Sequence, residues 1–287
     1  MTDETKEFPP ELSTPEFNHR LWISFGKQAE LLEKARMQIY REKSVVVGTD
    51  AVWSFVIPFL HSIVDSCSSL YILAQAQRAQ GCFIIGRTLF EQVVNICYVL
   101  AKGSDVATRA RLHLLQKSYR DLERQVTVGS QTVNLKWEGK EGLQITPEME
   151  AAVKEFTTKK GTEIRDWTPE SILQRIEAID AHFGNNIGTR LQLVYMAIYR
   201  NASEISHGTL FGTYFLAGLT QPRQMRIPDD LPNQRREWIS MLLLLLGGCI
   251  EIILSVLGNY TDTKSFVEVS RKEIHAVRKE LRGEQNG

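Results

Sequence analysis

The sequence predicts an all-α protein, a multi-helix bundle with a small irregular or hairpin insertion at about residues 125–165. Apolar residues recur at helical spacing through most of the 287 residues. The period changes to two only locally, where five apolar residues alternate on the two sides of Gly129-Ser130. The chain shows no internal repeat at the periods that build solenoids. A helical bundle with one excursion accounts for all three observations.

Residues 1–48 are predicted to form a polar tail and one amphipathic helix. Residues 1–15 contain three prolines and few apolar side chains, which is typical of a mobile tail. From about residue 16 to 43, Leu21, Phe25 and Leu32 recur near helical spacing among charged residues. Gly48 ends this segment, and residues 49–287 are expected to form the main helical domain.

Glycine and proline divide residues 49–287 into the expected helices. Gly103 marks the end of one helix, and a proline in the first turn marks the starts at Pro147 and Pro169. Glycines at 208, 212 and 218 indicate irregular chain after the helix that ends near 207. The expected helices are 50–79 with Pro58 inside it, 82–102, 105–124, 147–159, 169–183, 189–207, 233–258 and 262–282.

The composition argues against several classes of protein. Lys plus Arg number 34 and Asp plus Glu number 34, so the formal charge is zero. Broad nucleic-acid binding needs a basic excess, although a small local site does not. The chain contains no HExxH, no glycine-rich phosphate loop and no GxSxG, so metal hydrolase, P-loop ATPase and α/β-hydrolase are poorly supported. We therefore expect neither a metal nor a cofactor.

The cysteines and the first residues indicate a cytoplasmic protein. The four cysteines lie in apolar, helix-like surroundings and form no CxxC pair, so we expect buried, reduced thiols. They are Cys67, Cys82, Cys97 and Cys249. Residues 1–10 are acidic and polar, which gives no secretory signal.

One apolar segment is long enough to cross a bilayer. Residues 238–257 read WISMLLLLLGGCIEIILSVL, with Glu251 as the only charge. The sequence suggests no second span of this kind. We interpret the segment as a buried central helix, and membrane association is the alternative. A buried carboxylate is costly unless it is paired, so we expect Glu251 to have a partner, plausibly an arginine.

Residues 200–207, Arg-Asn-Ala-Ser-Glu-Ile-Ser-His, carry the main functional signal. Seven positions on a helix fall within about 20° of two full turns, so Arg200 and His207 share one face, with Ser203 and Glu204 between them. A guanidinium matches phosphate geometry, and an imidazole transfers protons near neutral pH. The pair suits RNA cleavage without a metal. The spacing alone is more typical of a structural role, in which Arg200 pairs with Glu204 and His207 caps the helix.

A polar stripe lies on an otherwise apolar helix. Arg87, Glu91, Asn95 and Tyr98 fall on one face at i, i+4, i+8 and i+11. Buried polar groups must be satisfied inside the protein. An Arg87–Glu91 ion pair that fixes helix packing is one interpretation. A second interpretation is that the stripe faces the helix that carries residues 200–207, here called the motif helix, and orients its groups. The two interpretations are compatible.

With these residues in view, the chain resembles the HEPN superfamily of all-helical proteins, many of which are metal-independent ribonucleases. Their signature is an arginine, often followed by a small polar residue, and then a histidine after a short gap; Arg200, Asn201 and His207 match it. The chain also looks like an uncharacterised bacterial family that pairs Arg-Thr-Leu-Phe-Glu, here residues 87–91, with Tyr-x3-Ser-x3-His, here residues 199–207. The similarity covers roughly residues 50–220.

The resemblance implies a homodimer in which two motif helices meet and RNA is the substrate. It implies that Arg200 and His207 are catalytic and that Asn201 supports them. The pattern of the bacterial family adds Tyr199 as a supporting group. From the residues, we add Ser203, Glu204, Arg87 and Glu91. The resemblance also suggests a toxin or phage-defence effector held by a cognate antitoxin or defence-system partner. A non-catalytic helical module that binds nucleotides or proteins is the alternative, and a membrane-associated helical protein is the second.

Overall fold

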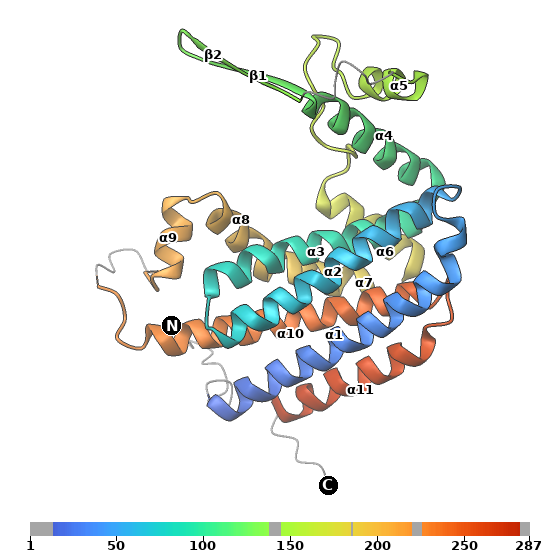
Figure 1. Ribbon diagram of the computed structural model, residues 1–287. Helices are drawn as coiled ribbons and strands as arrows, with labels where there is room; N and C mark the ends of the chain where they lie inside the picture. The colour runs from blue at the N-terminus through green and yellow to red at the C-terminus, as the bar shows by residue number, and fades with distance from the viewer. Residues whose placement is uncertain (1–13, 138–144, 185, 220–225, 282–287) are drawn as a thin grey trace.

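The computed structural model describes residues 14–137, 145–184, 186–219 and 226–281, and it confirms the all-α class (Figure 1). The expected tail over residues 1–13 lies outside these ranges. The helices are α1 (Pro15–Lys43), α2 (Ala51–Gln75), α3 (Ala79–Lys102), α4 (Ser104–Asp121), α5 (Pro147–Glu155), α6 (Ile172–Phe183), α7 (Ile187–Val194), α8 (Arg200–Ser206), α9 (Leu210–Leu216), α10 (Leu231–Leu257) and α11 (Lys264–Leu281). A 3-10 turn, Ser44–Val46, follows α1, and the strands are β1 (Glu123–Val128) and β2 (Gln131–Lys136).

Helix α10 lies in the middle of the bundle, with α1, α3, α7 and α11 packed around it (Figure 1). Most of its residues from Ile239 to Leu257 are buried. Phe25 of α1, Leu60 of α2 and Phe90 of α3 belong to the same hydrophobic core as Ile250 of α10. Burial of apolar surface therefore joins the N-terminal helix to the rest of the bundle in one core.

Glu251 on α10 has the arginine partner that the sequence predicts. Its side chain is only 8% exposed, and its Oε2 lies 2.7 Å from Nη2 of Arg190 on α7. Arg271 on α11 approaches the other oxygen, Oε1, at 3.3 Å. Arg190 also donates to the backbone oxygen of Gly248 at 3.3 Å. One carboxylate thus connects three helices.

Three helices, rather than the one expected, are long and apolar enough to cross a membrane by length and composition. They are α2, α3 and α10, and the expectation of a single candidate was wrong. The α10 window is 72% buried inside the protein, whereas the α2 window is 33% buried. The apolar surface of α10 is thus covered by its own chain, and α2 leaves more of its surface at the outside of the bundle.

The four cysteines are buried and free, as expected. Burial raises the pKa of every one of these thiols, and those of Cys82 and Cys249 reach about 12. They therefore remain thiols rather than thiolates at physiological pH.

The expected insertion projects from the end of α4 as a hairpin followed by α5 (Figure 1). Strands β1 and β2 pair antiparallel through register pairs such as Val126↔Val133, and Gly129 at the turn has a φ of +61°. Every hairpin residue is exposed. The residues predicted for this excursion include 138–144, which lie outside the described ranges. Thr146 caps α5 and Pro147 occupies its first turn, as predicted.

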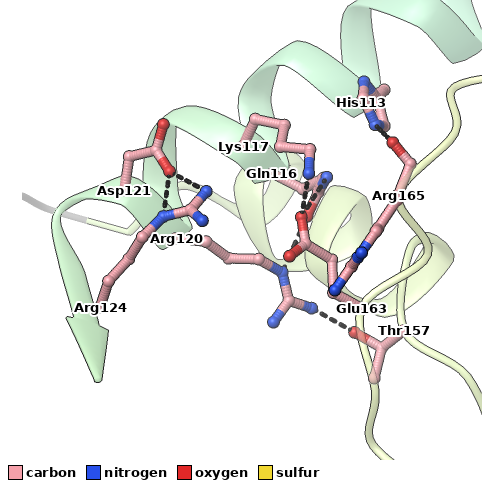
Figure 2. Close-up of polar contacts among 9 residues, drawn as sticks. All are labelled: His113, Gln116, Lys117, Arg120, Asp121, Arg124, Thr157, Glu163 and Arg165. Atoms are coloured by element: carbon pink, nitrogen blue, oxygen red, sulfur yellow. Dashed lines mark hydrogen bonds and ion pairs between the residues drawn. The ribbon is translucent and has the colours of Figure 1, made fainter. Parts of the chain in front are cut away.

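Polar contacts attach the returning chain to α4 (Figure 2). Nε2 of His113 donates to the backbone oxygen of Arg165 at 2.8 Å, and Lys117 pairs with Glu163. Arg120 donates to Thr157 Oγ1 at 2.6 Å. Burial lowers the pKa of His113, and the hydrogen bond from Lys117 lowers the pKa of the Glu163 carboxyl. The insertion is therefore held by charged and polar groups, together with the buried ring of Phe156, which meets the His113 ring edge-on at 5.0 Å.

Several expected boundaries differ from the structure; the expected helix 50–79, for example, ends at Gln75. Three further differences have a local cause. Helix α6 begins at Ile172 because Ser171 and Gln174 form a capping box, so Pro169 lies before the helix and not in its first turn. The expected helix 189–207 is interrupted by a π-helical turn at Tyr195–Tyr199. The chain after Gly208 is not irregular throughout, because Thr209 caps the short helix α9.

Replacing Arg190 with methionine should lower the free energy of unfolding by about 3 kcal/mol, because Glu251 would keep a buried charge with only Arg271 beside it. Urea denaturation measures the change. Arg271→Met is the matched control, and it should cost less than about 1 kcal/mol because its side chain is 59% exposed. Equal and small effects of the two substitutions would contradict the bridging role of Glu251.

Candidate functional site

The two residues of the motif lie at the two ends of helix α8. Arg200 is the first residue of α8, and His207 follows its last residue, Ser206. The backbone nitrogen of Thr209 donates to Glu204 O at 3.1 Å, and that of Gly208 donates to Ile205 O at 3.1 Å. Gly208 has a φ of +63°, so the helix closes in a Schellman motif. This ending holds His207 at the C-cap, two helical turns after Arg200.

Arg200 and His207 are both exposed to solvent. Within the described residues, neither side chain forms a hydrogen bond or an ion pair. The expected structural alternative, an Arg200–Glu204 pair, is not formed. Glu204 instead accepts a hydrogen bond from Thr209 Oγ1 at 2.7 Å, which ties it to the start of α9. The guanidinium and the imidazole are thus accessible to a ligand.

The polar stripe of α3 contacts the motif helix through Arg87. Its Nε pairs with Oε1 of Glu91 at 2.9 Å, as predicted. Its Nη1 donates to Ser206 Oγ at 3.0 Å, and its Nη2 donates to the hydroxyl of Tyr199 at 3.3 Å. The guanidinium carbon also lies 4.7 Å from the centre of the Tyr199 ring. The predicted ion pair is confirmed, and Arg87 also contacts the chain at both ends of the motif helix. That the stripe orients the groups of the motif stays a prediction.

Arg87 and Tyr199 both keep their protons around neutral pH. Burial acts to lower the pKa of Arg87, but the hydrogen bond and the charge of Glu91 outweigh it and raise the pKa. Burial, assisted by the charge of Glu91, also raises the pKa of Tyr199. Tyr199 therefore keeps its proton and cannot act as a base near neutral pH.

The polar stripe of α3 also contacts α6, through Asn95. Arg175 donates to Oδ1 of Asn95, and its guanidinium carbon lies 5.9 Å from the centre of the Trp167 ring. Burial lowers the pKa of Arg175, and the charge of Glu91 opposes this effect. Arg175 was not expected in this cluster, because its own segment carries no pattern that separates it from a surface arginine.

The π-helical turn and α9 fix the position of α8. Tyr195 and Tyr199, four residues apart, stack at 4.9 Å between ring centres. A Cβ on Gly212 would lie 2.6 Å from the backbone oxygen of Glu204, so α9 packs directly against the backbone of α8. π-helical turns often occur at functional sites. No feature of the sequence signalled this turn.

The remaining expected residues lie close to the motif with less defined contacts. Ser203 is half-buried, and its backbone oxygen accepts from Ser206 Oγ at 2.9 Å. Asn201 is half-buried, and its side-chain amide forms no hydrogen bond with any described residue. No group of three or more His, Cys, Asp or Glu side chains that could hold a metal ion occurs in the described part of the chain.

Residues 54–221, more than half of the chain, match the model of a family of unknown function, DUF5677. The chain belongs to this family. The match runs from α2 to the segment after α9, so it includes the Arg87 stripe and residues 200–207. It leaves out α1, α10 and α11; of these, α1 packs against α2, and α10 packs against α3 and α7. No curated protein and no solved structure matches the chain.

Arg87→Met should lower the free energy of unfolding by about 1 to 2 kcal/mol, because Glu91, Ser206 and Tyr199 lose a charged hydrogen-bond partner. It should also increase amide exchange over residues 199–209, measured by mass spectrometry. Thr88→Ala, at the next and exposed position, is the control and should change neither quantity. Unchanged exchange in Arg87→Met would show that this arginine does not position the motif.

Proposed function

We propose that the chain is a metal-independent endoribonuclease that acts as a cytoplasmic homodimer, under the control of a cognate antitoxin or defence-system partner. One observation carries the proposal. Arg200 and His207, two turns apart on one helix, are exposed and have no protein partner among the described residues. An exposed arginine and an exposed histidine beside the contacts of Arg87 are suited to bind and cleave a phosphodiester. The resemblance stated above adds RNA as the substrate.

The chemistry needs the 2′-hydroxyl of the ribose, a base, an acid and a cation beside the phosphate, which copies of these two side chains can supply. A base takes the proton of the 2′-hydroxyl, and the 2′-oxygen attacks phosphorus. The bond to the 5′-oxygen breaks, and an acid protonates that oxygen. Arg200 stabilises the negative charge that builds on the phosphoryl oxygens. The products are a 2′,3′-cyclic phosphate and a 5′-hydroxyl.

A homodimer follows from the number of proton-transfer groups. The base and the acid act on opposite sides of the phosphorus, and each chain offers one histidine in the motif. Two copies related by a two-fold axis supply both His207 side chains and both Arg200 side chains. Arg87 and Glu91 act as positioning residues, because they touch the motif helix rather than the phosphate.

Exposed apolar residues around the motif support the dimer. Leu193 and Met196 precede Arg200 in the chain, and they are 52% and 68% exposed. After His207, Leu210 is 72% and Phe211 is 51% exposed. Exposed apolar groups near a site are typical of a protein interface. Such an interface would bring two motif helices together.

Wild-type protein should cleave single-stranded RNA in EDTA and leave a 2′,3′-cyclic phosphate, detected by mass spectrometry of the products. His207→Ala should slow cleavage by about 10²- to 10⁴-fold, and Arg200→Ala by about 10²- to 10³-fold. His275→Ala, an exposed histidine on α11, is the control and should cleave normally. An RNA with one 2′-deoxyribose should resist cleavage at that position alone.

Cleavage that continues in His207→Ala, or that stops in EDTA, would refute the mechanism. Binding of RNA without cleavage in the wild-type protein would favour the non-catalytic nucleotide-binding module instead.

Met196→Glu should convert a dimer to a monomer in sedimentation experiments and reduce cleavage in parallel, because a charge in an apolar interface is poorly solvated. Leu114→Glu changes a residue on α4 that is 64% exposed, and it should leave both the mass and the cleavage unchanged. A wild-type protein that is monomeric at the assay concentration and still cleaves RNA would disprove the shared site.

A further inference from the structure

A cavity of about 220 Å³ lies beside the motif, between the π-helical turn, α8, α9, α3 and α10. Aromatic rings form much of its wall. Phe215 of α9 and Trp238 of α10 stack at 4.8 Å, and Phe83 of α3 meets Phe215 edge-on at 5.6 Å. Phe215 and Trp238 are both only half-buried. The cavity therefore offers aromatic surface to a flat, apolar group.

Asn201 is the one residue with a side-chain amide among those that line this cavity. A carboxamide carries two donors and an acceptor, and here none is used by another described residue. An aromatic wall with a single free amide is chemically suited to a planar heterocycle, which can stack on the rings and hydrogen-bond through its edge.

The volume limits the size of the ligand. Pockets for drug-sized molecules measure about 300–1,000 Å³. At about 220 Å³, this cavity has room for one ring system and not for two stacked bases.

Its position connects the cavity to the motif. Arg200 and Asn201 are consecutive residues of α8, and successive helical side chains are separated by about 100°. Arg200 is exposed to solvent, whereas Asn201 lines the cavity. A nucleotide also has two ends, a base and a phosphate joined by the ribose. One nucleotide can therefore lie across the edge of α8, with its base beside Asn201 and its phosphate near Arg200.

We propose that this cavity binds one unpaired nucleobase of the RNA strand whose phosphodiester is cleaved at Arg200 and His207. The inference rests on the proposed function for the identity of the strand. Only a base that is not paired in an RNA duplex can enter, so the cavity selects single-stranded regions. Adenine matches the amide best, because its N6 donor and N7 acceptor pair with a carboxamide in two hydrogen bonds.

The direct test is a titration of the full-length protein with AMP, followed by intrinsic tryptophan fluorescence. A base stacked against Trp238 should quench its emission, and ribose 5-phosphate, which has no base, should not. The protein has five tryptophans, so Trp238→Phe locates the signal. This variant should lose the quenching and still bind AMP in equilibrium dialysis, because phenylalanine retains a stacking surface. Equal responses to AMP and ribose 5-phosphate would overturn the proposal.

A second test fills the cavity with a larger side chain. Ala197 lines the cavity and is exposed, so Ala197→Phe should place a ring in the space for the base and weaken AMP binding by about 10-fold or more. Ala181→Phe, at an exposed alanine of α6, is the matched control and should bind normally. Asn201→Leu should weaken AMP binding several-fold while thermal unfolding stays unchanged. AMP binding by Ala197→Phe at wild-type strength would overturn the proposal.

The two proposals fail in different ways. His207→Ala should lose RNA cleavage and keep AMP binding. AMP binding at this cavity in a wild-type protein that never cleaves RNA refutes the ribonuclease and retains the nucleobase site. RNA cleavage that is equal in the wild type and in Ala197→Phe, without AMP quenching in either, refutes the nucleobase site alone.

Discussion

Helix α10 is apolar around most of its circumference, so other parts of the chain have to cover every side of it. Helices α1, α3, α7 and α11 meet this need, and their own apolar faces decide where they lie. Glu251, the one acid in the apolar stretch of α10, adds specific polar contacts to this packing. Its two arginine partners fix the rotation of α7 and α11 relative to α10, which apolar contacts alone do not specify.

The candidate site follows from that arrangement. Helix α7 is held by Arg190, and the π-helical turn carries the chain onward into α8. Arg87 of α3 then contacts α8 near both ends, and Gly212 allows α9 to pack against its backbone. The supporting side chains of Arg87 and Glu91 are partly buried, while Arg200 and His207 are exposed. A rigid support with free functional groups is what a preorganised site requires.

Periodicity predicted the helices and the hairpin, because burial of one face leaves a clear pattern in the sequence. The spacing of Arg87 and Glu91 also predicted their ion pair. The break at Tyr195–Tyr199 was not predictable, since it depends on ring stacking and on packing against α3. The short helix α9 was missed because its glycine reads as a helix breaker, whereas Gly212 provides close contact with α8. Arg175 joins the site only through tertiary contacts.

The buried thiols have a consequence for how the molecule responds to its surroundings. Oxidants and alkylating agents react with thiolates that they can reach, and all four cysteines are inside the core with raised pKa values. The cysteines of the native protein therefore do not react with such reagents. A cysteine introduced on its surface would be its sole reactive thiol, so spectroscopic labels can be attached site-specifically without first removing the natural cysteines.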